Sequence, residues 1–570
     1  MILALLLAMT PADSLHALID RDWASRLAES PQRATYAGVH EYDDRLGQVD
    51  EASQQRRLVE LKQRFAELQA IPRGGLPRAD QVNAEVLAEE LRARIAHIEV
   101  KQYLITIQGD ESFYSNLSQL PRNQPLHDVA EYEKYLKRLR DIPRYFDENL
   151  ALMRTGLKLG MTSPQVILKG RDQAARMHAV NDVHQSVFYK PFEKIPAAIP
   201  AAEAARLRAA GEAAIREAVV PAYAKVAKFI AEEYIPGARK TIAASELPGG
   251  REYYRSQIRE YVTKDISPEE IHALGLREVA RIHAEMESIK TEVGFKGDFA
   301  AFLVYLRTDP QFYAKTPEEL LMRAAYIAKD IDGRLPAFFG VLPRLPYRVE
   351  AVPADIAPFY TGGRYVEASA GSDEPGTYWV NTYDLKSRPL YVLPALTLHE
   401  AVPGHHLQIA LAAEQHGLPA FRRFSYFSVT GEGWGLYAEK LGQEMGVYKT
   451  PYERFGRLTY EMWRACRLVV DTGMHAMGWP REKSISFMRD NTALSEHEIE
   501  TETDRYIGWP GQALSYKIGE LAILELRRKA EVALGPRFDK RKFHDAILST
   551  GSVPLPVLEE EIDRFINQSH

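Results

Sequence analysis

The sequence predicts a mainly α-helical protein that carries one small β-sheet. From residue 13 to about residue 340, apolar residues recur at three- and four-residue steps, and the breaks fall at proline or glycine. That spacing is the period of amphipathic helices. Between residues 343 and 382, aromatic and β-branched residues alternate with polar ones and glycines interrupt the run, which indicates short strands. Helical spacing returns after Pro389 and continues to the C-terminus.

The first residues form a short apolar run. Residues 1–9 resemble the apolar core of a secretion signal, and residues 10–12 offer a candidate cleavage site, although no basic residue precedes the run. We therefore expect a periplasmic or secreted protein whose mature chain begins near Asp13. If the run is instead the end of a buried helix, we expect a cytoplasmic protein. No later stretch of about 18 uncharged apolar residues could span a bilayer.

Three segments illustrate the helical pattern. Residues 58–68 carry apolar side chains at helical steps, and residues 201–233 are rich in alanine and glutamate. Ser267 is a typical N-cap, Pro268 suits the first helical position, and two glutamates follow in the first turn. We interpret the segments at 201–233 and 267 as scaffold.

The change of pattern near residue 343 gives a working division of the chain. Residues 1–12 are the candidate signal remnant, residues 13–342 form a mainly helical subdomain, and residues 343–570 form a second subdomain with the sheet. Its last predicted strand, residues 377–382, is expected to line a cleft with its edge and to pair with an extended peptide. The alternative is an ordinary hairpin in the core.

The composition is that of a soluble globular protein. Hydrophobic residues make up 45% and charged residues 26% of the 570-residue chain. The formal net charge is -6 and no basic stripe is visible, which argues against a nucleic-acid partner. Cys466 is the only cysteine, which excludes an intramolecular disulfide and a cysteine-rich metal site. Any metal must therefore be held by histidine and carboxylate side chains.

Three histidines and one glutamate fall within eight positions: His399, Glu400, His405 and His406. In the usual H-E-x-x-H zinc motif the histidines lie four residues apart, so both imidazoles reach one metal while the glutamate activates its water. Here proline occupies position 403, where the second histidine of that motif would stand. His405 lies six residues after His399, and a regular helix turns it about 240° away.

The Pro403-Gly404 pair is expected to correct this geometry. Proline deletes one backbone hydrogen bond and glycine tolerates unusual dihedral angles, so a two-residue bulge can bring His405 back toward His399. His406 returns to the face of His399 but lies about 10 Å further along the axis. We therefore predict His399 and His405 as metal ligands, and assign His406 to the surroundings of the metal or to the substrate.

A third ligand is expected from the next predicted helix, which begins near residue 430. Glu432 lies 33 residues after His399, and a carboxylate from a following helix completes a His2Glu site for Zn2+ with the fourth position open for water. Glu439 lies two turns further on the same face and is predicted to orient an imidazole. The alternative for Glu432 is a carboxylate that only stabilises its helix N-terminus.

Four stretches carry a family resemblance: His399–Gln408, Glu432–Glu439, Val470–His475 and Pro510–Gly519. In order and spacing they resemble the bacterial family called domain of unknown function 885 (DUF885). That family is similar in turn to helical gluzincin peptidases such as carboxypeptidase Taq and angiotensin-converting enzyme. The resemblance implies a large helical gluzincin-like fold, with two helical halves around a peptide-binding cleft and a small sheet near the active site. The two extra residues between the histidines depart from those peptidases.

Further residues are candidates to complete the site. Asp471 and His475 lie one helical turn apart, so the carboxylate can orient an imidazole that donates to a developing oxyanion. Tyr516 is a candidate phenolic donor, a role that the resemblance implies. Core packing is the alternative for His475 and for Tyr516. Arg505 and Lys517 are candidates to bind a peptide carboxylate, with a solvated surface charge as the alternative.

The sequence therefore predicts a zinc-dependent hydrolase whose expected substrate is a peptide, with residues 343–570 as the catalytic subdomain. Zn2+ activates water in such sites, Glu400 is the expected general base, and His475 and Tyr516 are expected to share the oxyanion. Two other functions stay open. One is a zinc hydrolase of a non-peptide ester or amide, and the other is a secreted binding protein whose metal is structural.

Overall fold

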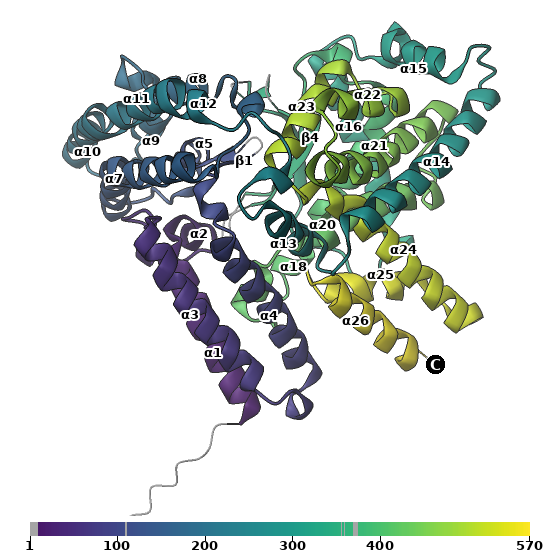
Figure 1. Ribbon diagram of the computed structural model, residues 1–570, viewed down its shortest axis with the longest axis horizontal. Coiled ribbons are helices and arrows are strands. Elements are labelled where there is room, and N and C mark those ends of the chain that lie inside the picture. The colour runs from purple at the N-terminus through teal and green to yellow at the C-terminus, as the bar shows by residue number, and fades with distance from the viewer. Residues whose placement is uncertain (1–9, 109–110, 355, 358–359, 369–373, 570) are drawn as a thin grey trace, which may run out of the picture. The chain divides into compact units, whose positions relative to one another are not determined.

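Helices make up most of the computed structural model, which confirms the predicted mainly α fold (Figure 1). The structure describes all residues except 1–9, 109–110, 355, 358–359, 369–373 and 570. The apolar part of the candidate signal therefore lies outside the described residues, and Thr10 caps the first helix. The chain divides into two compact units. The first comprises residues up to 242 together with 246–253, and the second comprises 243–245 and most of 254–570.

The first unit is built from helices and one two-stranded hairpin. Its elements are α1 (Pro11–Glu29), α2 (Pro31–Tyr36), α3 (Glu51–Ala70), α4 (Arg78–Glu99), β1 (Ile107–Gln108), β2 (Glu111–Ser112), α5 (Phe113–Leu117), α6 (Leu120–Asn123), α7 (Val129–Leu159), α8 (Arg171–Arg176), α9 (Lys190–Glu193), α10 (Ala201–Ala214), α11 (Val220–Phe229) and α12 (Ile235–Gly237). Two π-turns join α10, α11 and α12 into one continuous helical run. The long helix predicted at residues 201–233 is therefore confirmed.

The second unit contains the sheet and the remaining helices, and α13 (Gly250–Val262) runs from the first unit into it. Its elements are α14 (Pro268–Glu292), α15 (Phe299–Thr308), α16 (Pro317–Asp332), β3 (Tyr347–Ala351), β4 (Gly363–Val366), β5 (Gly376–Val380), α17 (Leu393–Glu400), α18 (His405–Ala413), α19 (Ala420–Arg423), α20 (Ser428–Glu444), α21 (Pro451–Ala476), α22 (Arg481–Asn491), α23 (Glu496–Gly508), α24 (Ser515–Leu534), α25 (Lys540–Ser549) and α26 (Leu555–Gln568). The division expected near residue 343 lies inside this unit.

The small sheet of the second unit has the strand order β3-β5-β4. β5 pairs in parallel with β3 and antiparallel with β4. The strand expected at residues 377–382 is therefore the central strand, and its edges are both occupied. The outer strands are β3 and β4, which both precede β5 in sequence, and this corrects the expectation that the last strand supplies the edge.

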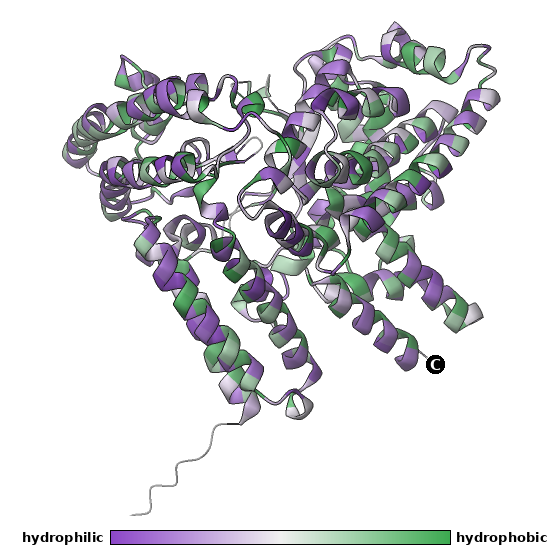
Figure 2. Ribbon diagram, viewed as in Figure 1, coloured by the Kyte–Doolittle hydropathy of each residue, from purple (hydrophilic) through white to green (hydrophobic). Residues whose placement is uncertain are grey.

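Local sequence signals explain how several helices begin and pack. The Ser267 hydroxyl accepts the Glu270 N–H while the Glu270 carboxylate accepts the Ser267 N–H, so the predicted cap of α14 is present as a full capping box. α26 buries Leu558, Ile562 and Ile566 at helical spacing, and green and purple residues alternate along it in Figure 2. Packing of such apolar faces supplies most helix stability in a folded chain.

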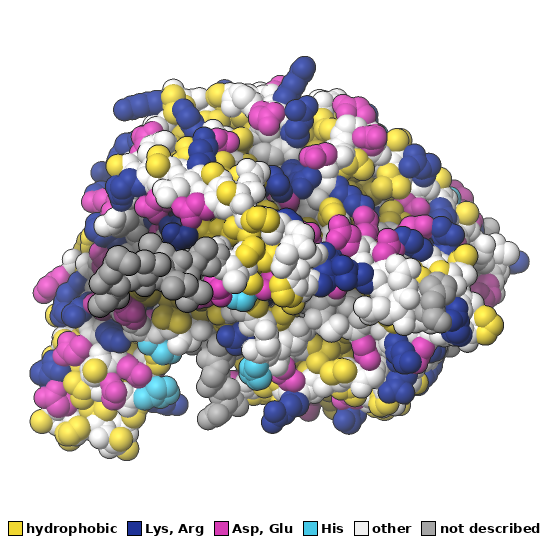
Figure 3. All heavy atoms as spheres, turned by 90° about the horizontal axis from the view of Figure 1, so that it is seen from below, with side chains coloured by type: hydrophobic (Ala, Val, Ile, Leu, Met, Phe, Trp, Pro, Cys, Tyr) yellow, Lys and Arg dark blue, Asp and Glu magenta, His cyan; other side chains and the backbone are white. Residues whose placement is uncertain are grey.

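Charged side chains of both signs lie on the surface. On the face drawn in Figure 3, acidic and basic side chains are interspersed with hydrophobic ones. Among the helices that the structure describes, we find none with the length and apolar character needed to cross a bilayer.

The contact between α14 and α21 forms a large part of the core of the second unit, and the two helices lie side by side in Figure 1. α21 is buried on all sides from Phe455 to His475. A Cβ on Gly275 of α14 would lie 2.7 Å from Val469 Cγ2 and 2.8 Å from Leu468 Cβ. The glycine therefore sets how closely the two helices approach.

We predict that Gly275→Ala destabilises the protein by about 1–3 kcal/mol, because the added methyl overpacks this helix contact. The free energy of unfolding is measured by chemical denaturation. Gly333→Ala is the matched control, since the nearest atom to its new Cβ is 3.6 Å away. Equal stability of the two variants would contradict the role given to this contact.

Candidate metal centre

The helix that carries His399 ends directly after Glu400, and α18 begins at His405. Pro403 has no N–H to continue the helical hydrogen bonds. A Cβ at Gly404 would lie 1.8 Å from the carbonyl oxygen of His399, so no other residue fits there. The structure thus has a break between two helices in place of the expected bulge, because the chain must fold back against the end of α17.

The break places both histidines next to Glu432 of α20. His399 Nε2 lies 3.5 Å and His405 Nε2 lies 3.4 Å from Glu432 Oε2. The three candidate ligand atoms all lie within 4.8 Å of one another. His399 is 2% exposed and His405 is 9% exposed, so both imidazoles are buried. The structure therefore brings together the three residues predicted as ligands.

Glycines allow α20 to approach the histidines. A Cβ at Gly435 would lie 2.7 Å from Cε1 of the His399 ring, and a Cβ at Gly433 would lie 2.5 Å from the backbone of Gly519 in α24. Between them, the buried Trp434 donates from Nε1 to the Pro403 carbonyl over 2.7 Å. The alternation of glycine and tryptophan after Glu432 therefore fixes α20 against both the histidine turn and α24.

The geometry of the three side chains fits a small divalent metal. Their 3.4 and 3.5 Å separations exceed those of strong hydrogen bonds, which are about 2.7–3.2 Å. Two ligands of a tetrahedral zinc ion with bonds of about 2.0–2.1 Å lie about 3.4 Å apart. Two imidazoles and one carboxylate are also a ligand set of catalytic zinc sites. The residues present therefore fit the expected Zn2+.

The charges around the cluster also favour a cation. Although burial disfavours its charged form, the imidazoles of His405 and His399 hold the pKa of Glu432 well below its usual range. Although burial again opposes the charge, contacts with Glu432 and Glu439 raise the pKa of His399 to about 9. The carboxylates therefore attract positive charge to the space between the rings, which a proton or a metal ion can supply.

A carboxylate and an aromatic ring hold His399 in place. The expected contact with Glu439 is present, since Oε1 of Glu439 lies 2.8 Å from His399 Nδ1. That bond leaves Nε2 for the metal. The ring of Tyr516 is stacked on His399 with a centroid distance of 6.4 Å. His405 lacks a comparable support, because its buried Nδ1 has no hydrogen-bond partner among the described residues.

Glu400 faces the edge of the sheet. Its Oε2 accepts the backbone N–H of Tyr365 on β4 over 2.9 Å, and the residue is 9% exposed. It directly follows His399 in α17, so the candidate general base lies beside the ligands. His406 points elsewhere, because its Nδ1 hydrogen-bonds with the Tyr365 phenol over 3.1 Å and its ring packs on Tyr347. Burial lowers the pKa of His406 to about 4.

His475 and Asp471 are buried on α21, and their hydrogen bonds differ from those expected of an oxyanion donor and its orienting carboxylate. Nδ1 of His475 accepts the N–H of Ala244, and Nε2 donates to the carbonyl of Tyr506. Asp471 accepts hydrogen bonds from the Tyr254 hydroxyl and the N–H of Gly511, and burial raises its pKa to about 7. These contacts match the core-packing alternative for His475, since both ring nitrogens are engaged with backbone groups.

Arg505 and Lys517 are not the solvated surface charges that the alternative described. Lys517 is fully buried, and Nζ contacts the carboxylates of Glu461 and Glu520 at 2.7 and 2.5 Å. Arg505 bonds Glu502 and donates from Nη1 to Gln512 over 2.8 Å. Both cations sit in networks with internal carboxylates, because a buried charge is stable only with such partners.

Three further residues lie near the site and are not among those that the sequence predicts. Tyr365 contacts Glu400 through its backbone and His406 through its phenol. Tyr426 donates from its phenol to Glu432 Oε1 over 3.4 Å. The guanidinium of Arg467 lies 4.2 Å from the Tyr516 ring centroid. Only Tyr365 had a local signal, since it lies in the predicted strand region, and tertiary packing alone brings the other two to the site.

The fold and the site define a mainly helical protein with a candidate His2Glu metal centre. Residues 31–562 match the family described as "Bacterial protein of unknown function (DUF885)", and the chain belongs to this family. This confirms the DUF885 resemblance of the sequence motifs. The further likeness to gluzincin peptidases stays an expectation.

Two solved structures are similar to the chain over nearly its whole length. A "putative lipoprotein" from Colwellia psychrerythraea is 28% identical with a TM-score of 0.91, and the match covers 98% of this chain and 100% of that one. A "putative lipoprotein of unknown function" from Shewanella oneidensis is 19% identical with a TM-score of 0.72, and the match covers 97% and 99%. The second likeness concerns the fold alone. A search of curated proteins gave no match.

We predict that Gly435→Ala weakens zinc binding by about 10- to 100-fold, the loss typical when the support of a metal ligand is disturbed. The new methyl would meet the His399 ring at 2.7 Å and push it from Glu432. Zinc affinity is measured by competition with a chelating dye. Gly417→Ala serves as the control because no atom lies within 4 Å of its new Cβ. Unchanged affinity in Gly435→Ala would show that the close approach does not position the ligand.

Proposed function

We propose that the protein is a zinc-dependent hydrolase that cleaves peptide bonds. The observation that carries the proposal is the convergence of His399, His405 and Glu432 beside Glu400, which itself lies at the edge of a strand. Three protein ligands leave a fourth position for water, which is the composition of catalytic zinc sites, whereas structural sites have four protein ligands.

The proposed chemistry divides between the metal and the chain. Zn2+, when bound, lowers the pKa of its water toward 7 and polarises the scissile carbonyl. Glu400 takes the proton of that water and passes it to the leaving amine. The N–H of Tyr365 holds one oxygen of Glu400 in place, so the other oxygen is free to face the reacting water. Attack by water is direct, and no covalent intermediate with the chain forms.

The edge of β4 supports an extended peptide as substrate. The Asn381 N–H donates to the Gly362 carbonyl, and this bond sets the alternation of the β4–β5 ladder. The backbone N–H and C=O groups of Arg364 and Val366 then face β5, whereas those of Gly363 and Tyr365 face away from β5. Glu400 already accepts the outward N–H of Tyr365, so a peptide that adds to this edge would pair with the other outward groups and run past Glu400.

Tyr516 is the remaining donor in the proposal. Its ring is nearly parallel to that of His399, at a centroid distance of 6.4 Å. The guanidinium of Arg467 lies 4.2 Å from the centroid of the Tyr516 ring, and Arg467 also donates to Tyr506 and Glu502. The ring of Tyr516 therefore lies near His399, and we assign its phenol as a donor to the oxyanion. His475 is left out of the proposed mechanism, because both its ring nitrogens meet backbone groups.

Export of the protein is part of the proposal. The two similar structures carry the description "putative lipoprotein", and the sequence begins with a short apolar run. Both observations support a protein that works outside the cytoplasm, where peptides from outside the cell are the accessible substrates.

Glu400→Gln is expected to keep one zinc per chain and to lose about 100- to 10,000-fold in kcat, because it removes the proton acceptor and leaves the ligands in place. Zinc content is measured by atomic emission, and turnover by mass spectrometry of a diverse peptide mixture. Glu414→Gln, at the end of α18, is the control for the same chemical change. Full turnover in Glu400→Gln, or no peptide cleaved by the native zinc-loaded protein, would refute the proposed function.

His405→Ala and His406→Ala are expected to separate metal binding from its surroundings. His405→Ala should lose zinc affinity by more than about 100-fold, since it removes a direct ligand. His406→Ala should retain zinc and change turnover only, because its ring contacts Tyr365 and Tyr347. Zinc affinity and kcat are measured separately for each variant. The opposite pattern would reverse the choice of ligand.

A further inference from the structure

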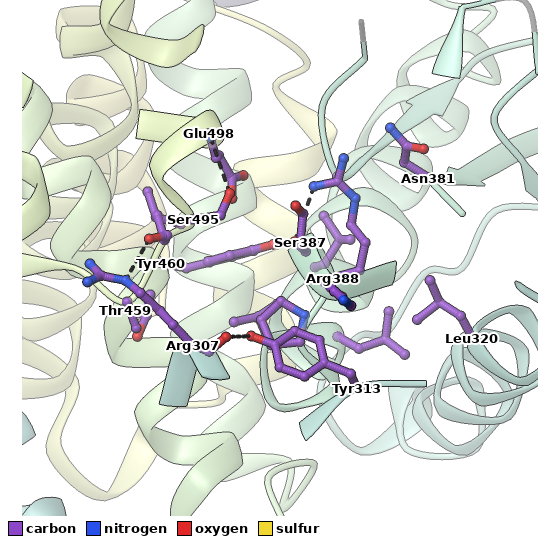
Figure 4. Close-up of a pocket in the computed structure, with 18 of the residues that line it drawn as sticks. Arg307, Tyr313, Leu320, Asn381, Ser387, Arg388, Thr459, Tyr460, Ser495 and Glu498 are labelled. Carbon is purple, nitrogen blue, oxygen red and sulfur yellow. Dashed lines mark hydrogen bonds between the residues drawn. The ribbon is translucent and has the colours of Figure 1, made fainter. Parts of the chain in front are cut away.

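A cavity is lined by residues of α17 that lie about one turn before the candidate general base Glu400. Figure 4 shows side chains that line it. Val392, Leu393 and Leu396 line it near the start of α17, and Gly362 just before β4, Val380 of β5 and Tyr460 of α21 line it as well. The walls are mainly apolar. The charged side chains that line it come from other segments: Lys386 and Arg388 precede α17, Arg307 ends α15, and Glu498 belongs to α23.

Two hydrogen-bonding groups of this cavity have no partner among the described residues. They are Nε of Arg388 and the hydroxyl of Thr459, and both atoms are buried. Thr459 is 1% exposed. A buried donor without a partner costs about 1–3 kcal/mol, so such groups mark a place where a ligand or water completes the bonding. A ligand that fills the cavity must therefore accept a hydrogen bond from a guanidinium.

The charge of the lining points to an anionic ligand. Arg307, Lys386 and Arg388 carry three positive charges, and Glu498 supplies one carboxylate. Arg307 already donates to backbone carbonyls of Leu494 and Thr492. Burial raises the pKa of Glu498 even though Arg388 lowers it. The carboxylate of Glu498 is thus a weak counter-ion, and the positive charge at Arg388 stays partly unbalanced.

The size of the cavity limits the ligand to one short side chain or a chain end. Its volume is about 50 Å³. One water needs roughly 10–15 Å³ of such space, so the cavity takes on the order of 3–5 water-sized groups. A carboxylate with one or two methylenes has this size, whereas an aromatic side chain does not fit.

The cavity is close to the proposed reaction centre. Leu396 and Glu400 are four residues apart on α17, so they share one face and lie about 6 Å apart along the axis. The chain that enters β4 also leads from Gly362 at the cavity to Tyr365 at Glu400. Three residues of strand span about 10 Å. A side chain in the cavity therefore belongs to a peptide residue within two or three positions of the bond at Glu400.

We propose that this cavity binds a carboxylate of the peptide substrate through Arg388 and Thr459, so that the protein acts on acidic peptides or at peptide C-termini. The inference rests on the proposed function, because it takes the peptide to lie along β4. The carboxylate has two sources, an aspartate or glutamate side chain and the C-terminal carboxylate of the peptide. Both satisfy the same guanidinium, and the experiment distinguishes them.

The test measures equilibrium binding to the zinc-loaded Glu400→Gln protein by calorimetry. The probes are six-residue alanine-based peptides with one glutamate at each position in turn, the matching glutamine peptides, and each peptide with a free or amidated C-terminus. We expect one carboxylate to raise affinity about 10- to 100-fold over its neutral partner, the worth of a hydrogen bond between charged groups. A glutamate preference assigns the side chain, and loss on amidation assigns the C-terminus.

Added variants then locate the effect. Arg388→Gln, combined with Glu400→Gln, should abolish the preference for the carboxylate and leave affinity for the neutral peptide unchanged. Arg348→Gln on β3 is the matched control, since it removes the same charge from a residue that does not line the cavity. Thr459→Val should reduce the preference about 2- to 10-fold without any change of charge. It therefore decides the matter even if Arg388→Gln fails to fold.

The outcomes separate this inference from the proposed function. Equal affinity for all acidic and neutral peptides, or a preference that survives both Arg388→Gln and Thr459→Val, would overturn the cavity assignment. Cleavage of the same peptides by the native zinc-loaded protein is followed by mass spectrometry. If no peptide is cleaved, the proposed function fails, while the binding data still decide whether the cavity takes a carboxylate.

Discussion

The whole site depends on a steric constraint at Gly404. Its α-carbon packs so closely on the carbonyl of His399 that a single added methyl would lie 1.8 Å from that oxygen. This contact lets the chain end one helix at Glu400 and begin another at His405. Because six residues separate the two histidines, a straight helix would send their rings to different sides. The tight turn brings them to the same carboxylate.

The surrounding helices hold this turn with buried polar contacts. Trp434 binds the Pro403 carbonyl, and Glu439 binds His399. Glu439 in turn lies 3.6 Å from Arg464 of α21, so the His399 imidazole is linked to a helix that is buried from Phe455 to His475. A buried charged network of this kind costs desolvation and gains specificity only when its members are paired. Such a network suits a site that must hold two imidazole rings and a carboxylate at fixed short distances from one another.

Local sequence patterns predict the helical fold, the cap at Ser267 and the three residues that meet in the candidate site. Helical periodicity, capping and ligand spacing all depend on residues that are near one another in the sequence. They do not predict long-range pairing. The strand near residue 380 has no local mark that makes it central in its sheet, and His475 has none that shows its ring nitrogens bound to Ala244 and Tyr506. The phenol of Tyr426 reaches Glu432 only through the packing of α20.

The most direct test of the central claim is anomalous diffraction at the zinc edge from crystals of the native chain grown with zinc. We expect one anomalous peak per chain, about 2.0–2.2 Å from Nε2 of His399, Nε2 of His405 and an oxygen of Glu432. A peak bonded to His406 would contradict the ligand assignment. The absence of any peak between His399 and His405 would contradict the metal centre itself.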